Sequence, residues 1–201
     1  MRAERAATLG LAFACALGAS FVLGGCYAGS AHAITAREVA ADPGWIVVPD
    51  VPLIRQSGSN DCGAAALAMV LAHWQRPISL EEISARDPEA ASKGWKAGQL
   101  RDLARERGLQ AFIVSGGLDD LSHEIGQGRP VLVGVVKRYR DKPRAHYEVV
   151  IGIHRAKRRI LTLDPADGWR EDSLEGFASE WVPTKQVTLV VLAPKPALAG
   201  S

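Results

Sequence analysis

The sequence of 201 residues has few cysteines and no excess of either charge. Its three cysteines are Cys15, Cys26 and Cys62, and two of them lie within or beside an apolar leader, so a disulfide framework cannot hold the fold together. No closely spaced Cys/His pairs occur, which disfavours a metal site. The net charge of +2 is too small for nucleic-acid binding, which needs several cations to neutralise phosphates. We therefore expect no metal, no cofactor and no nucleic-acid partner.

The first 25 residues predict an export signal. Arg2 and Arg5 form a basic start, and an uncharged run rich in Ala, Leu and Gly follows from residue 6 to residue 23. The run ends in Leu23-Gly24-Gly25-Cys26. A large aliphatic residue, two small residues and a cysteine resemble the lipobox of bacterial lipoproteins. That resemblance implies that Cys26 is lipidated and attaches the chain to a membrane.

Two alternatives to a lipoprotein signal stay open. The uncharged run also reaches the length of a weak membrane span, so an ordinary secretory signal or an uncleaved anchor would fit it. Gly24-Gly25 resembles the double-glycine end of a bacteriocin leader as well, but a cysteine follows at once and no bacteriocin-like segment comes after it. Tyr27 is not the aspartate associated with inner-membrane retention. We expect an extracytoplasmic location in the cell envelope, at the outer membrane or the periplasmic face if the host is Gram-negative.

The remaining sequence predicts one domain with an extension at each end. Residues 26–44 are small and polar and predict a lipid-anchored tether, with a reach of roughly 60 Å at about 3.3 Å per residue. Residues 45–194 form a domain large enough to bury a sizeable core. Residues 195–201 are a C-terminal tail.

Helical patterns come first in this domain and strand patterns come later. The expected helices are 62–74, which is apolar nearly all round behind the potential N-cap Asp61, a short one starting at the capping box Ser79–Glu82, 98–107 and 118–125. The expected strands are 131–136, 147–153, 160–163 and 187–192. This order predicts an α+β fold in which a buried helix packs on an antiparallel sheet.

A lone thiol, Cys62, lies at the first turn of the buried helix. Free backbone N–H groups and the positive end of the helix dipole favour the thiolate, which is the nucleophilic form of cysteine. The alternative is a small hydrophobic residue packed at a helix start.

The segment from Gln56 through Asp61-Cys62-Gly63 resembles the active-site signature of the bacteriocin-leader-processing (double-glycine) peptidases, a papain-like cysteine peptidase family. The resemblance implies a papain-like fold, with Cys62 as nucleophile and Gln56 as part of the oxyanion hole. It also assigns the catalytic base to His146, which opens an aromatic-then-aliphatic strand. The orienting carboxylate becomes Asp164, which ends a strand in Asp-Pro. Phe177 and Trp181 would pack beneath the sheet.

The other histidines are weaker candidates for the base. His73 lies about 16 Å from Cys62 along the helix at about 1.5 Å per residue, and His32 lies in the tether. His123 and His154 favour solvated or structural roles. Glu148 shares a strand face with His146 and either competes with Asp164 for the imidazole or meets solvent at the cleft rim.

We expect a stand-alone lipoprotein member of this family, an extracytoplasmic cysteine peptidase that hydrolyses peptide or protein substrates. The transporter-linked members differ in carrying a membrane domain and a nucleotide-binding domain. Two other classes remain: a transglutaminase-like or cell-wall amidase activity using acyl transfer, and a non-catalytic, lipid-anchored binding module that retains the fold. The sequence leaves the cleavage specificity and the oligomeric state open.

Overall fold

One antiparallel sheet organises the computed structural model, which describes residues 27–140 and 142–193. Within these residues the strands follow the order β1-β7-β6-β5-β4-β8-β3, and β2 pairs with β5. The predicted α+β class with an antiparallel sheet is confirmed. The strands are β1 (His32–Ala33), β2 (Ile46–Val47), β3 (Gln110–Ser115), β4 (Val131–Arg138), β5 (Pro143–His154), β6 (Arg159–Asp164), β7 (Gly168–Ser173) and β8 (Val187–Leu192).

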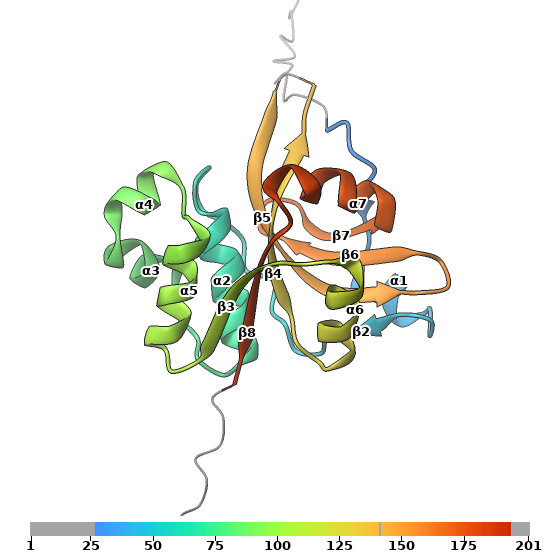
Figure 1. Ribbon diagram of the computed structural model, residues 1–201, viewed down its shortest axis with the longest axis horizontal. Coiled ribbons are helices and arrows are strands. Elements are labelled where there is room, and N and C mark those ends of the chain that lie inside the picture. The colour runs from blue at the N-terminus through green and yellow to red at the C-terminus, as the bar shows by residue number, and fades with distance from the viewer. Residues whose placement is uncertain (1–26, 141, 194–201) are drawn as a thin grey trace, which may run out of the picture.

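The helices form two groups, with α2 to α5 on one side of the sheet and α6 and α7 on the other (Figure 1). Each group closes its own apolar core against the sheet, as expected for a sheet that buries both faces. The bounds are α1 (Ala36–Ala40), α2 (Cys62–His73), α3 (Leu80–Arg86), α4 (Pro88–Lys93), α5 (Ala97–Glu106), α6 (Leu118–Gly126) and α7 (Leu174–Trp181), followed by a 3-10 turn at Val182–Thr184.

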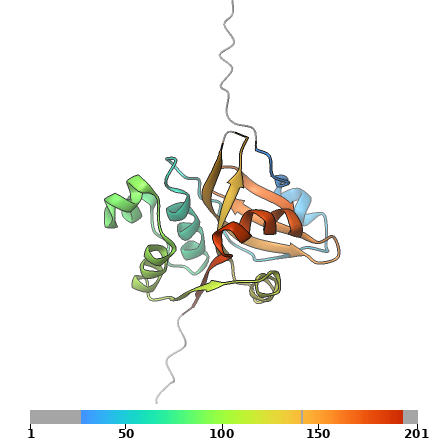
Figure 2. The same ribbon diagram turned by 45° about the horizontal axis from the view of Figure 1, so that its top comes forward.

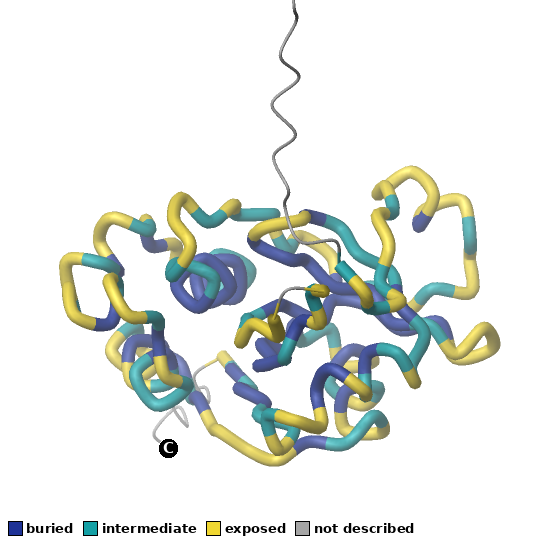
Figure 3. The backbone as a smooth tube through the Cα atoms, turned by 90° about the horizontal axis from the view of Figure 1, so that it is seen from above, coloured by how far each residue is buried: buried dark blue, intermediate teal, exposed yellow. Residues whose placement is uncertain are grey.

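Helix α2 lies in the first of these cores. All nine residues from Gly63 to Leu71 are buried, which confirms the expectation of a helix that is apolar nearly all round (Figure 3). Asp61 occupies the N-cap position, but its side chain makes no capping hydrogen bond. Its carboxylate instead accepts hydrogen bonds from Ser57 Oγ at 2.7 Å and Gly58 N at 2.8 Å. Asp61 therefore shapes the loop before the helix rather than capping it.

Most of the other predicted elements are present. Ser79 Oγ accepts the Glu82 N–H at 3.1 Å and starts α3, and Gly108, with φ +78°, follows the end of α5. Phe177 and Trp181 of α7 are buried in the second core, as expected. The sequence analysis did not predict the helices α4 and α7 or the strands β3 and β7.

The prediction that the segment before residue 45 is a free tether is wrong for its described residues, 27–44. Between residues 27 and 44, β1 pairs with β7, and α1 follows its N-cap Thr35, whose capping box with Glu38 is complete. Tyr27 forms a β-bridge with Tyr139 at the end of β4, so this segment follows the domain surface (Figure 2). The predicted signal peptide, Cys26 and the C-terminal tail lie outside the described residues. No helix among the described residues is long and apolar enough to cross a bilayer.

Gly63 provides a test of the packing between α2 and its neighbours. A Cβ at this position would lie 2.9 Å from Trp95 Cβ and 3.1 Å from Tyr147 Cδ2. We expect Gly63→Ala to lower the free energy of unfolding by about 1–3 kcal/mol, measured by thermal or urea unfolding, because it overpacks a buried site. Gly98→Ala in α5 is the matched control, because a Cβ there meets nothing within 4 Å. Equal stability of the two variants would contradict this account.

Candidate active site

His146 and Asp164 meet across the pairing of β5 and β6. The antiparallel register, with Val149 opposite Leu163, brings both residues to the same end of the two strands. His146 Nε2 lies 2.8 Å from Asp164 Oδ1, and the carboxyl group is buried. The same oxygen accepts the backbone N–H groups of Ala166 at 2.8 Å and Asp167 at 3.2 Å. The turn after β6 thus fixes the carboxylate that orients the imidazole.

Cys62 is the first residue of α2, which packs on β5, and its thiol hydrogen-bonds with His146. Because Nε2 faces Asp164, Nδ1 is the ring nitrogen left for the sulfur. The backbone groups of Tyr147 and Gly63 also hydrogen-bond to the thiol. The structure therefore brings the predicted thiol, imidazole and carboxylate into one chain of hydrogen bonds.

The electrostatics favour a thiolate–imidazolium pair. Burial by itself raises the pKa of Cys62, but the hydrogen bond and charge of His146 outweigh burial and lower the pKa below its ordinary value. Burial by itself lowers the pKa of His146, yet the hydrogen bonds to Asp164 and Cys62 raise it to about 10. Burial of the Asp164 carboxyl is likewise outweighed by His146 and Lys137, which hold its pKa well below the usual range. The lowered pKa of Cys62 increases the fraction of the sulfur that is in its nucleophilic, thiolate form.

Gln56 lies beside this chain, in a loop tied to the turn after Asp164. Its backbone N–H donates to Pro165 O at 3.1 Å, and its side-chain amide donates to Gly58 O at 2.8 Å. A primary amide carries two N–H donors, of which this contact uses one. Gln56 and His146 both line an open cleft of about 200 Å³. The predicted oxyanion residue Gln56 therefore lies at the cleft, and one of its side-chain N–H groups hydrogen-bonds to its own loop.

Lys137 is the residue of this site that the sequence analysis missed. Its side chain is buried, pairs with Glu148, and places Nζ 3.4 Å from Asp164 Oδ2 and 3.8 Å from Glu180 Oε2. Burial acts to lower the pKa of Lys137, but the carboxylates of Glu148 and Asp164 raise it above its ordinary value. A lysine that follows an apolar run in β4 resembles any strand end in the sequence, so no local signal revealed it.

The two predicted alternatives for Glu148 are both wrong. Glu148 shares the strand face of His146 as expected, but it is buried rather than exposed at the cleft rim, and it pairs with Lys137. The imidazole hydrogen bond goes to Asp164. His146, Glu148 and Asp164 offer ligand atoms within 4.8 Å of one another, but the positive charge that a metal ion would bring there already comes from Lys137.

The remaining histidines lie in other surroundings. His154 is buried against Trp45, with Nε2 3.3 Å from Asp42 Oδ1, and His73 Nδ1 lies 3.2 Å from Pro49 O. His123 is exposed on α6. These positions agree with the structural and solvated roles expected for them.

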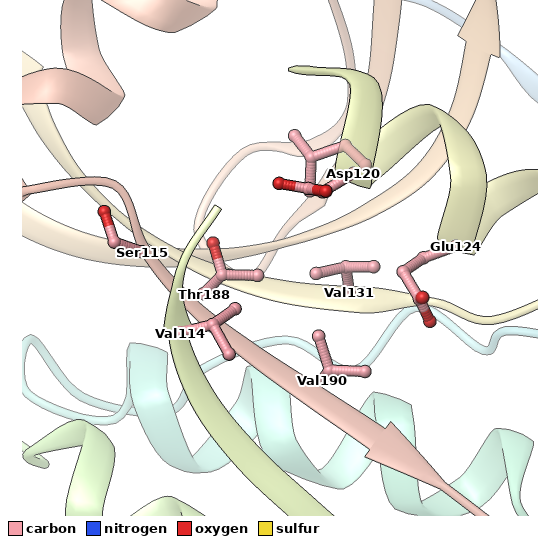
Figure 4. Close-up of a pocket in the computed structure, with 8 residues that line it drawn as sticks. Val114, Ser115, Asp120, Glu124, Val131, Thr188 and Val190 are labelled. Carbon is pink, nitrogen blue, oxygen red and sulfur yellow. The ribbon is translucent and has the colours of Figure 1, made fainter. Parts of the chain in front are cut away.

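A second recess lies away from the thiol, between α6 and the strands β3, β4 and β8 (Figure 4). Its volume is about 290 Å³. It offers carboxylates and hydroxyls but no thiol or imidazole, so the nucleophile and base belong to the other cleft. Its lining includes Val114, Ser115, Asp120, Glu124, Val131, Thr188 and Val190.

Comparison with known proteins agrees with this geometry. Residues 50–195 match the Peptidase C39 family. A curated relative, the lactococcin-G-processing and transport ATP-binding protein LagD of Lactococcus lactis subsp. lactis, is 27% identical over 147 residues, which are 72% of this chain and 19% of the relative. The chain thus spans about a fifth of the length of that relative.

Solved structures share the fold. A double-glycine-motif protease from an AMS/PCAT transporter, solved with its leader peptide, is 25% identical with a TM-score of 0.57, over 71% of this chain and 91% of that one. The peptidase domain of Streptococcus ComA, a bifunctional ABC transporter of a quorum-sensing pathway, has a TM-score of 0.59 at 24% identity, over 72% and 99% of the two chains. A C39-like peptidase from Bacillus anthracis has a TM-score of 0.60 at 16% identity, over 75% and 98%.

The predicted papain-like fold is therefore confirmed. With a family match that covers most of the domain and a thiol, imidazole and carboxylate joined in its cleft, this chain belongs to the C39 family of double-glycine, bacteriocin-processing cysteine peptidases.

Proposed function

We propose that this chain is a lipid-anchored, extracytoplasmic peptidase that hydrolyses peptide bonds with Cys62, His146, Asp164 and Gln56. The observation that carries the proposal is the chain of hydrogen bonds from the thiol through the imidazole to the buried carboxylate. The lipid anchor is supported by Leu23-Gly24-Gly25-Cys26 in the sequence.

The reaction follows from the protonation states of the pair. The Cys62 thiolate attacks the carbonyl carbon, and the oxygen takes the negative charge beside the Gln56 amide and the N–H groups at the start of α2. His146 then gives its proton to the leaving amine as the C–N bond breaks, which leaves a thioester on sulfur. Water, deprotonated by His146, attacks the thioester, and the C–S bond breaks to release a carboxylic acid and to restore the thiolate beside the protonated imidazole.

Lys137 acts as a positioning residue in this scheme. Its ammonium group faces the Asp164 oxygen that the imidazole does not use, so the carboxylate stays ionised and fixed in orientation. An ionised Asp164 in turn keeps His146 protonated while the thiolate waits for substrate.

Peptides with a double-glycine motif are the first substrates to test. The AMS/PCAT relative is described as a double-glycine-motif protease and was solved with a leader peptide. The curated relative is described as processing lactococcin G. We propose the same class of substrate for this chain, with cleavage after the second glycine.

The nucleophile is tested by Cys62→Ala in the full-length protein. We expect cleavage of a Gly-Gly peptide, followed by mass spectrometry, to fall by at least about 10⁴-fold, because the covalent route is lost. In the unaltered protein Cys62 should react with iodoacetamide at neutral pH faster than free cysteine does. His123→Ala, on an exposed face of α6, is the control and should cleave normally. Undiminished cleavage by Cys62→Ala would refute a thiol peptidase, and products joined to an added amine would favour acyl transfer.

The anchor is tested by Cys26→Ser. We expect the unaltered chain, produced in a bacterial host, to incorporate labelled palmitate and to fractionate with membranes. Cys26→Ser should lose the label, because the serine hydroxyl does not replace the thiol of the lipobox. Cys15→Ser, within the leader, is the matched control and should keep it. Label retained by Cys26→Ser would show that the lipid is attached elsewhere.

The buried charges are tested through the pH profile of cleavage. The alkaline limb follows loss of the His146 proton, whose pKa is about 10, and the charge of Glu148 helps to raise that pKa. We expect Glu148→Gln to move the alkaline limb to lower pH by on the order of one unit, and Asp164→Asn to move it further because a direct hydrogen bond is weakened. Glu175→Gln, in an exposed pair with Arg158, should leave the limb in place. If the alkaline limb of Glu148→Gln stayed in place, the charge of Glu148 would not contribute to the pKa of His146.

A further inference from the structure

The described chain begins at the hairpin that joins β4 and β5, which is also the hairpin that flanks the active-site cleft. Tyr27 bridges Tyr139, and Ala28 N donates to Arg138 O at 2.7 Å. Both views of the ribbon place this first described segment beside the hairpin (Figures 1 and 2). Strand pairing thereby fixes Tyr27, the first described residue, next to the hairpin.

Several contacts hold Tyr27 in that position. Its ring lies 5.8 Å from the Tyr139 ring, with Lys137 Nζ 5.4 Å and Arg170 Cζ 5.5 Å from its centroid. Its hydroxyl is buried near the Glu180 carboxylate, and burial together with the charge of that carboxylate raises the pKa of Tyr27. Consecutive Cα atoms are about 3.8 Å apart, so a lipid on residue 26 is bonded within one residue of this cluster. The same holds for an uncleaved apolar leader, so the membrane must lie close to the hairpin in either case.

The hairpin carries basic residues at the same end of the molecule. Arg138, Arg140, Lys142 and Arg144 fall within seven residues of sequence and are exposed, against one acidic residue, Asp141, in that stretch. Arg138 lies 4.0 Å from Glu180, and the Arg144 guanidinium lies 4.7 Å over the Tyr139 ring. The whole chain has a net charge of only +2, so this cluster is a local concentration of cations and not a general property of the surface.

We propose that the β4–β5 hairpin rests on anionic lipid headgroups and holds the active-site cleft at the membrane surface. The inference rests on the membrane attachment proposed above and adds an orientation to it. Basic residues beside a lipid anchor are attracted to anionic headgroups, and this attraction acts only within a Debye length of the surface. A lipid anchor at one residue attaches the chain but leaves the domain free to rotate about it, and the electrostatic contact of the hairpin fixes that rotation.

The orientation bears on which substrates reach the thiol. Tyr139 and Arg144 line the cleft together with His146, which lies four residues along β5 from Lys142, about 13 Å at about 3.3 Å per residue. A domain seated on this hairpin opens its cleft next to the headgroups. It therefore favours peptides that emerge from the membrane or lie on it over peptides in free solution.

The test measures protection of Lys142 by lipid. The full-length chain is purified from membranes in detergent and reconstituted on phosphatidylcholine vesicles with or without phosphatidylglycerol. It is then labelled with a water-soluble amine reagent and analysed by mass spectrometry. We expect labelling of Lys142 to fall several-fold on the phosphatidylglycerol vesicles only, and to recover at high salt. Lys93 and Lys157, whose side chains are 72% and 63% exposed elsewhere, are internal controls and should label equally on both.

Charge variants separate the hairpin from the anchor. Arg140→Glu should abolish the protection of Lys142, whereas Arg155→Glu, at the opposite end of β5, should not. Equal labelling of Lys142 on the two kinds of vesicle, in a chain that floats with both, would overturn the hairpin contact and leave the anchor intact. A chain that floats with neither would refute the membrane attachment, and this inference with it.

Discussion

The site depends on one buried positive charge. Lys137 lies among the carboxylates of Glu148, Asp164 and Glu180, which come from β5, β6 and α7. Three carboxylates buried together would repel one another and take up protons, and the ammonium group, together with His146, keeps Asp164 ionised. Removing one partner from such a buried network typically costs about 3–5 kcal/mol, because it leaves a charge uncompensated. The charge of Lys137, which faces Glu180 of α7, therefore also supports the carboxylate that orients His146.

The N-terminal segment takes part in this arrangement. Tyr27 places its ring 5.4 Å from Lys137 Nζ, while Ser30 Oγ donates to Asp172 Oδ1 at 2.6 Å. Burial raises the pKa of Tyr27 above its ordinary value, so its hydroxyl stays neutral beside the carboxylates. The N-terminal segment thus helps to shield Lys137, the charge behind the active site, from water. It is part of the surroundings of the site and not a passive linker.

Local sequence patterns were enough to predict the elements that depend on periodicity and on helix capping. The apolar α2, the Ser79 cap and the strands β4, β6 and β8 follow from periodicity and capping, and the resemblance supplied Cys62, His146 and Asp164. The folded segment after Cys26 was missed because β1 is two residues long and exists only by pairing with the distant β7. Lys137 was missed for a related reason, since its importance comes from partners contributed by three other elements.

The thiol and the imidazole come from two different parts of the fold, helix α2 and the sheet, and this explains why a glycine, Gly63, lies where the two meet. Helix α2 delivers the nucleophile and the sheet delivers the base, so the hydrogen bond between them depends on how closely the two parts approach. Gly63 permits an approach at which any side chain would strike Trp95 and Tyr147, and Tyr147 contributes a backbone hydrogen bond to the sulfur. A shift of a few tenths of an ångström there would lengthen the contacts of the thiol before it unfolded the domain. Packing at this glycine is for that reason part of the chemistry of the site.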